Sequence, residues 1–130
     1  MTRILCIEPD GMYRSVFLKI FTDQPFTLTF MEGSALLKER DTLAADILFC
    51  SLELPDADPY AIYAHVRGKH SSLPIIFFTE ENINRHLDWF SGTETTNVLA
   101  KPFTREELLF FLDKLVHGHR AFGLKNYLKQ

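Results

Sequence analysis

Several apolar segments of this sequence end in a polar residue that could act in catalysis or bind a ligand. In open α/β sheets, sites form at the carboxyl ends of the strands, so residues in such positions are expected to converge. A serine hydroxyl there is a poor nucleophile unless a base lies beside it. A lysine could hold an anion together with strand-end backbone amides, although no glycine-rich phosphate loop accompanies it. These residues are Glu8-Pro9-Asp10 after Arg3–Ile7, Ser51 after Ile47–Cys50, Thr79 after Pro74–Phe78, and Lys101 after Asn97–Ala100.

The segments that carry these residues alternate with helical segments along the chain. Apolar residues recur at helical spacing after each strand-like segment, and Asp10, Ser34 and Asp58 are placed to cap three of the helices. Thr104 and Glu107 form a capping box before the last of them. Strict alternation predicts βαβ units and a parallel sheet in one domain. The expected strands are 3–7, 26–30, 47–50, 74–79 and 97–100; the expected helices are 12–22, 35–40, 59–67, 81–91 and 104–117.

The composition excludes several classes of function. The net charge is −3 and no block of lysine and arginine occurs, which argues against direct nucleic-acid binding. No apolar run approaches the roughly 18 residues of a membrane span. The first residues enter a strand-like segment at once, so we expect no secretory signal and a cytoplasmic location. Cys6 and Cys50 lie in apolar runs and are expected to be buried, reduced thiols.

The ordered set of motifs resembles the receiver domain of bacterial response regulators across nearly the whole chain. The resemblance implies a single-domain, doubly wound (βα)5 flavodoxin-like three-layer sandwich with the parallel strand order 2-1-3-4-5, over residues 1–117. Residues 118–130 are expected to form a short helical tail. The matching pieces are the cluster Glu8-Pro9-Asp10, the run Ser51-Leu52-Glu53-Leu54-Pro55, the segment Pro74–Thr79, and Lys101-Pro102-Phe103.

The departures from the family decide the predicted function. The resemblance implies that an aspartate at the position of Ser51 would accept a phosphoryl group, with a divalent cation held by that aspartate and the acidic cluster. Here the acceptor position carries a neutral hydroxyl, and Pro9 replaces the second acid of the cluster. Magnesium prefers carboxylate oxygens, so its binding should be severely weakened. Thr79 and Lys101 match the residues that respond to the phosphoryl group, whereas Val98 replaces the aromatic switch residue.

Other residues allow alternative interpretations. Glu53 is expected to be a solvated loop residue, and Asp10 a helix cap, but either acid could act as a displaced phosphoryl acceptor. The pocket lined by Glu8, Ser51, Thr79 and Lys101 could instead sense a small anion. We expect His117 and His119 to be exposed and to bind no metal.

The last predicted helix carries more apolar residues than one buried stripe requires. Phe110 should point away from the sheet and Leu109 should lie at the margin. Such a surface marks a partner site unless the tail covers it, through Phe122 or Leu124. Trp89 and Phe90 could belong to the same contact surface or to the core.

The sequence therefore predicts a pseudo-receiver. We expect a non-enzymatic, phosphorylation-independent protein-interaction module in bacterial signal transduction, with no cofactor and no metal. Its partner would be another protein or a second copy, bound through the face formed by residues 81–91, 97–100 and 104–117.

Overall fold

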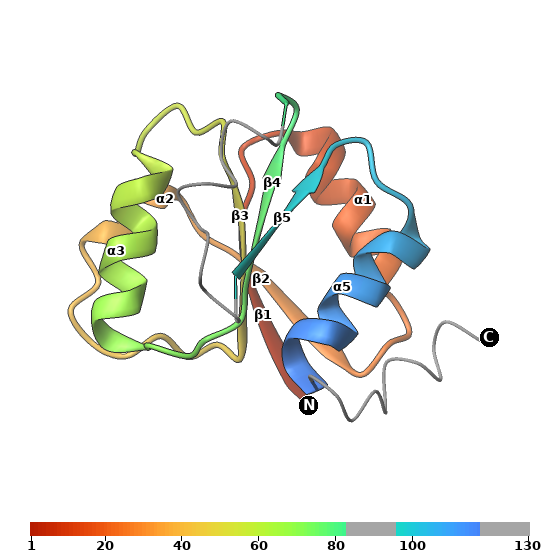
Figure 1. The fold of residues 1–130 in the computed structure, drawn as a ribbon, viewed down its shortest axis with the longest axis horizontal. Helices are drawn as coiled ribbons and strands as arrows, with labels where there is room; N and C mark the ends of the chain where they lie inside the picture. Colours follow the sequence, from red (N-terminus) through yellow and green to blue (C-terminus); the bar gives the residue numbers. More distant parts are fainter. Residues whose placement is uncertain (83–95, 118–130) are drawn as a thin grey trace.

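The structure, a computed structural model, describes residues 1–82 and 96–117 of the chain. Five parallel strands form one sheet in the order β2-β1-β3-β4-β5 (Figure 1). This order is the one predicted for a doubly wound, flavodoxin-like fold, and the prediction is confirmed. The strands are β1 (Thr2–Ile7), β2 (Phe26–Phe30), β3 (Ile47–Ser51), β4 (Ile75–Thr79) and β5 (Thr96–Ala100).

Helices cover both faces of the sheet and complete the three layers. Helices α1 (Gly11–Phe21) and α5 (Arg105–His117) lie on one face, and α2 (Gly33–Leu37) and α3 (Pro59–Lys69) lie on the other (Figure 1). Most of the helix predicted over 81–91 and the whole predicted tail over 118–130 lie outside the described residues. No helix in the described part of the chain is long and apolar enough to cross a membrane.

The predicted caps explain where three of the helices begin. The Asp10 carboxylate accepts a hydrogen bond from the Met12 amide at 2.9 Å, and Asp58 accepts one from Tyr60 at 3.0 Å. Thr104 and Glu107 form the predicted capping box, each amide donating to the other residue's side chain at 3.0 Å. These side chains satisfy backbone N–H groups that have no partner within the helix.

The prediction that Ser34 caps a helix over 35–40 is wrong. The helix begins earlier, at Gly33, and the Ser34 amide donates to the Asp56 carboxylate at 3.0 Å. This bond lowers the pKa of Asp56. The chain approaches the β3–α3 loop closely there, since a Cβ on Gly33 would lie 3.0 Å from the Ala57 Cβ. Packing between distant segments, which local spacing cannot reveal, therefore sets this helix start.

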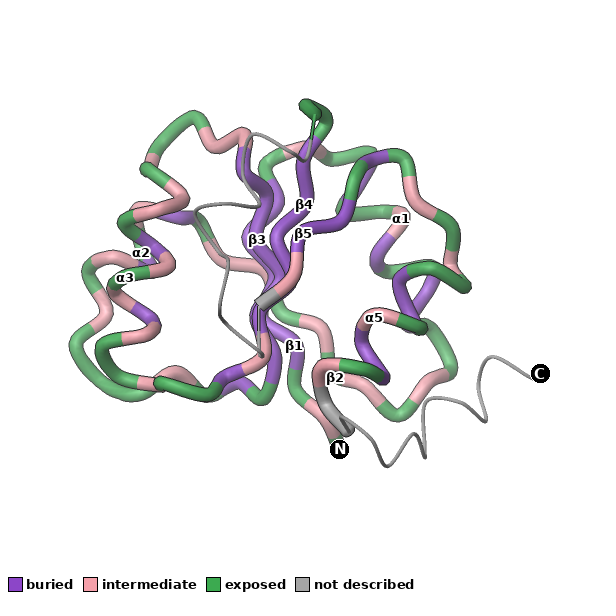
Figure 2. The backbone as a smooth tube through the Cα atoms, in the orientation of Figure 1, coloured by how far each residue is buried: buried purple, intermediate pink, exposed green. Residues whose placement is uncertain are grey.

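The central strands are buried on both faces, as Figure 2 shows for β3 and β4. The edge strand β2 alternates between half-buried and exposed residues, as predicted. Four phenylalanines form an aromatic cluster between the sheet and α1, in which the Phe17 ring lies 5.1 to 5.5 Å from the other three. The others are Phe49, Phe78 and Phe103. Ring packing therefore holds α1 against the sheet.

Both cysteines are buried and free, as predicted. Cys6 packs in the core layer under α1 and α5, whereas Cys50 packs in the layer under α2 and α3. Burial raises the pKa of both thiols well above the usual value. The two sulfurs face opposite sides of the sheet, so they cannot form a disulfide without rearranging the fold.

Replacing Phe17 with alanine should lower the free energy of unfolding by about 3–5 kcal/mol, because the side chain is fully buried and its removal leaves a cavity. Leu18→Ala, at the exposed neighbouring position on α1, should change it by only about 0.5 kcal/mol or less. Urea denaturation followed by circular dichroism measures both. Equal losses in the two variants would contradict this description of the core.

Candidate functional site: a crevice closed by internal contacts

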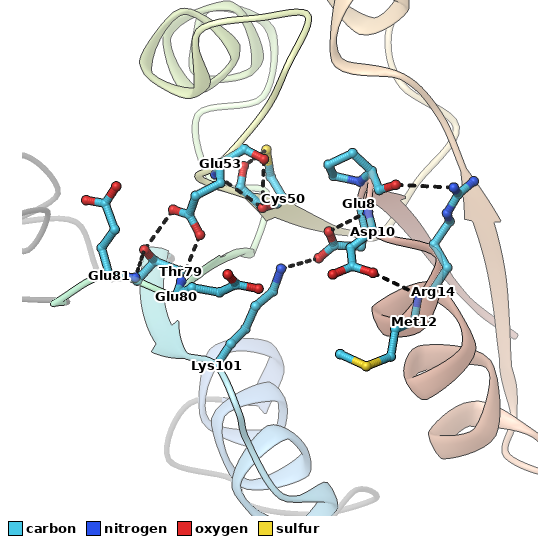
Figure 3. A network of polar contacts seen from close by, with 12 residues as sticks. Glu8, Asp10, Met12, Arg14, Cys50, Glu53, Thr79, Glu80, Glu81 and Lys101 are labelled. Carbon is cyan, nitrogen blue, oxygen red and sulfur yellow. Dashed lines mark hydrogen bonds and ion pairs between the residues drawn. The ribbon is translucent and has the colours of Figure 1, made fainter.

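The four residues predicted to line the pocket do converge. Glu8, Ser51, Thr79 and Lys101 lie at the carboxyl edge of the sheet, each at or directly after the end of a strand, and all four are buried. Figure 3 shows this region from close by. The neighbouring strands β1, β3, β4 and β5 therefore bring together side chains that are far apart in the sequence.

A buried ion pair crosses this crevice. The Lys101 Nζ lies 2.6 Å from the Glu8 Oε1, and the two side chains are only 3% and 2% exposed. The Lys101 ammonium also lies 4.3 Å from the centre of the Tyr13 ring, a cation–π distance. Burial raises the pKa of the Tyr13 hydroxyl, and the carboxylates of Glu80 and Asp10 add to this effect. Lys101 therefore already has an anion and an aromatic face as partners.

Glu8 is held on its other oxygen as well. Its Oε2 accepts a hydrogen bond from the Asp10 amide at 3.1 Å. The Asp10 carboxylate is in turn the cap of α1, so it faces the helix. Pro9, between the two acids, is exposed, and its carbonyl oxygen accepts a hydrogen bond from the Arg14 guanidinium at 3.3 Å. The cluster thus contributes one buried carboxylate, and that carboxylate is bound to Lys101.

The Ser51 hydroxyl, at the end of β3, forms hydrogen bonds with the backbone of the loop that follows. Its Oγ accepts a hydrogen bond from the Glu53 amide at 3.2 Å and donates to the Glu53 carbonyl at 3.4 Å. No carboxylate or imidazole among the described residues is bonded to this hydroxyl. Without a base beside it, the Ser51 oxygen has no activated lone pair with which to attack phosphorus.

The prediction that Glu53 is a solvated loop residue is wrong. Its Oε2 accepts a hydrogen bond from the Thr79 hydroxyl at 2.8 Å, and its Oε1 accepts one from the Glu80 amide at 2.7 Å (Figure 3). The Thr79 hydroxyl also accepts a bond from the Glu81 amide at 3.0 Å. The carboxylate therefore joins the loop after β3 to the end of β4. Sequence reasoning missed this role because the partners lie 26 and 27 residues away.

The arrangement does not fit a magnesium ion. Glu8 is occupied by an ammonium, Pro9 has no carboxylate, and Ser51 brings no charge. Within residues 1–82 and 96–117, no group of three or more His, Cys, Asp or Glu residues is arranged to hold a metal. A hard divalent cation requires several oxygen ligands, and here it would have to displace a lysine from a buried pair.

The remaining predicted residues lie in different parts of the structure, and two of them are buried in the core. Val98, at the switch position, is buried in the layer under α2 and α3. Leu109 is fully buried, so the prediction that it belongs to a contact surface is wrong; it faces the core together with Leu108 and Leu112. Phe110 is 56% exposed, as expected. Trp89 and Phe90 lie outside the described residues.

Comparison with known proteins identifies the family. The family model of the response regulator receiver domain matches residues 4–113. The chain belongs to the response regulator receiver domain family.

The relatives differ from this chain in most of their residues. The chain is 21% identical to the transcriptional regulatory protein CssR of Bacillus subtilis over 115 residues, covering 87% of this chain and 50% of CssR. A response regulator receiver protein from Sinorhizobium medicae has a TM-score of 0.76 at 21% identity, covering 90% of this chain and 95% of that one. The receiver domain therefore spans about half the length of CssR.

A third comparison concerns a receiver that holds a metal. The receiver domain of the sensor histidine kinase PA1611 from Pseudomonas aeruginosa was crystallised with a magnesium ion in its active site cleft. It has a TM-score of 0.74 and 23% identity, covering 90% of this chain and 98% of that one. The two proteins share the receiver fold.

Replacing Lys101 with methionine should lower the free energy of unfolding by about 3–5 kcal/mol, because it leaves the Glu8 carboxylate buried without a counter-charge. The double variant Glu8→Gln, Lys101→Met should lose clearly less, since neither side chain is then charged. Urea denaturation at neutral pH measures both.

The matched control is Arg3→Met, which breaks the ion pair of Arg3 with Asp46. Those side chains are 52% and 45% exposed, so this pair should contribute about 1 kcal/mol or less. If Lys101→Met were no more destabilising than Arg3→Met, the buried pair would not be the constraint described here.

Proposed function

We propose that this receiver domain is a pseudo-receiver: a non-enzymatic protein-interaction module of bacterial signal transduction that works without phosphorylation. The proposal rests on which residues occupy the crevice and how they are bonded to each other. The acceptor position holds an unactivated Ser51 hydroxyl, and the retained Lys101 is bound to Glu8 at 2.6 Å. In active receivers that lysine pairs with the phosphoryl group, whereas here its charge is already neutralised inside the protein.

The contact of Thr79 supports the same proposal. In active receivers the corresponding hydroxyl follows the phosphoryl group, and here it already donates to the Glu53 carboxylate at 2.8 Å. An internal anion thus takes the hydrogen bond that a phosphoryl oxygen would accept. The end of β4 and the loop after β3 are joined without any modification, which suits a module with one fixed conformation.

The two alternatives receive less support from the geometry. Glu53 and Asp10 are the acids considered as displaced acceptors, but both carboxylates already accept backbone hydrogen bonds. A small-anion sensor would need Lys101 to release Glu8 in a buried environment, where separating two charges is costly. The displaced-acceptor alternative is an outcome of the experiment that follows.

Incubation with acetyl phosphate and Mg²⁺ should leave the intact mass of the protein unchanged, because the crevice has Ser51 in place of the acceptor aspartate and Pro9 in place of one metal-binding acid. The matched variant is Ser51→Asp, which restores the acceptor carboxylate while Pro9 remains. A stoichiometric phosphoryl adduct on the wild type would overturn the proposal. Repeating the reaction with Glu53→Gln and Asp10→Asn would then locate the modified acid.

We further propose that the exposed part of α5 contributes to the interaction surface, with a second copy of the chain as the partner to test first. Phe110 projects from α5, and the ring of the half-buried Phe111 lies 5.8 Å from it. The two rings form a small apolar patch next to exposed charged residues of the same helix. An exposed aromatic side chain of this size is a common anchor in protein interfaces.

Wild-type protein should therefore sediment as a dimer at high concentration, and Phe110→Glu should weaken association. Both copies of a symmetric dimer carry the change, so the burial of two large apolar side chains is lost, about 1.5–3 kcal/mol each. This corresponds to roughly 100-fold or more in the dissociation constant. Leu18→Glu, at an exposed position on α1, is the control and should leave the mass unchanged. A monomer for both wild type and Phe110→Glu would exclude self-association through α5.

A further inference from the structure

A second cavity adjoins the crevice on the side of β2. It has a volume of about 380 Å³ and lies between the end of β1 and the loops that follow β2 and β3. It shares Glu8 and Pro9 with the crevice. Arg14 lies on the side of Glu8 away from Thr79 and Glu53 (Figure 3). Small-molecule sites in proteins have volumes from about 300 Å³ upwards, so a small ligand fits here.

Opposite charges line this cavity without pairing with each other. The Arg14 guanidinium makes one hydrogen bond, to the Pro9 carbonyl, and within the described residues it forms no ion pair with a carboxylate. The Glu32 side chain is exposed and makes no capping bond to the helix that follows it. Two further carboxylates of the lining already have partners: Glu8 pairs with Lys101, and Asp56 accepts a hydrogen bond from the Ser34 amide. Arg14 and Glu32 are therefore the cation and the anion of this lining with bonding capacity left.

The rest of the lining is largely apolar. Phe30, Met31 and Leu54 are each half-buried and line the same cavity, together with the buried Ile7. Apolar surface of this kind gains free energy when a ligand covers it. The site therefore combines an apolar wall with two unpaired charges of opposite sign.

This combination selects the chemical class of the ligand. A nucleotide or another multiply charged anion is disfavoured, because Arg14 is accompanied by the carboxylates of Glu32 and Asp56. A purely apolar ligand would leave the charges of Arg14 and Glu32 without partners. A ligand that carries one carboxylate, one ammonium and an apolar side chain meets all three features, and guanidinium groups bind carboxylates through two parallel hydrogen bonds.

We propose that the cavity binds a free α-amino acid with an apolar side chain. Its carboxylate would lie on Arg14, its ammonium group on Glu32, and its side chain against Phe30, Met31 and Leu54. Because Glu8 lines both this cavity and the crevice, and is bonded to Lys101, an occupant would contact the residue that ties β1 to the end of β5. The interaction module would then respond to a metabolite in place of a phosphoryl group.

Nuclear magnetic resonance titration of the full chain with L-leucine, L-methionine and L-phenylalanine tests the proposal. At least one should give saturable shifts of amides at residues 30–33 and 54–56 and raise the melting temperature. N-Acetyl-L-leucine lacks the ammonium group and isoamylamine lacks the carboxylate. Each should bind about tenfold or more weakly than leucine, since each loses a charge-assisted contact.

Variants separate this site from nonspecific binding. Arg14→Gln and Glu32→Gln change exposed side chains, so the fold should persist, and each should weaken binding about tenfold or more. The matched controls Lys19→Gln on α1 and Glu106→Gln on α5 should bind as the wild type does. Absence of saturable binding for all three amino acids, or unchanged affinity in Arg14→Gln, would overturn the proposal. Either result would leave the proposed independence from phosphorylation untouched, because it rests on other residues.

Discussion

The buried contact between Glu8 and Lys101 is the constraint on which the rest of the site depends. Two opposite charges that are almost completely removed from water must stay together, because a solitary buried charge is far less stable. Their pairing fixes the end of β1 against the end of β5, on either side of β3 and β4. It also supports the proposed function, since an ammonium and a carboxylate that are bonded to each other would offer little to a metal ion or a phosphate.

Glu53 has the corresponding effect on the other side of the crevice. It accepts hydrogen bonds from the Thr79 hydroxyl and the Glu80 amide, so the loop after β3 and the end of β4 are held by a permanent anion. Two internal carboxylates therefore bound the crevice. Glu8 neutralises the Lys101 ammonium, and Glu53 accepts hydrogen bonds from Thr79 and Glu80. Under the proposed function, these internal contacts take the hydrogen bonds that a transferred phosphoryl group would make in an active receiver.

Local patterns predicted most of the fold but only part of the site. Apolar runs and helical spacing located the strands and helices, and short-range caps such as Asp10 and Asp58 were recognisable because both partners lie within a few residues. Ser34 was wrongly assigned as a cap, and Glu53 was wrongly expected to be solvated, because their partners come from distant segments. Leu109 was misplaced for a related reason: more of the surface of α5 is buried in the core than its sequence suggested. The convergence of Glu8, Ser51, Thr79 and Lys101 followed from strand order alone, whereas their pairing required coordinates.

The placement of the two cysteines on opposite sides of the sheet has a practical consequence. Neither sulfur reaches the solvent or the other, so the native domain has no surface thiol among the described residues, and both cysteines of the chain are among them. A single cysteine introduced at an exposed position would be the preferred site for a fluorophore or spin label. Distances and docking events could thus be followed spectroscopically without first deleting native thiols from a tightly packed interior.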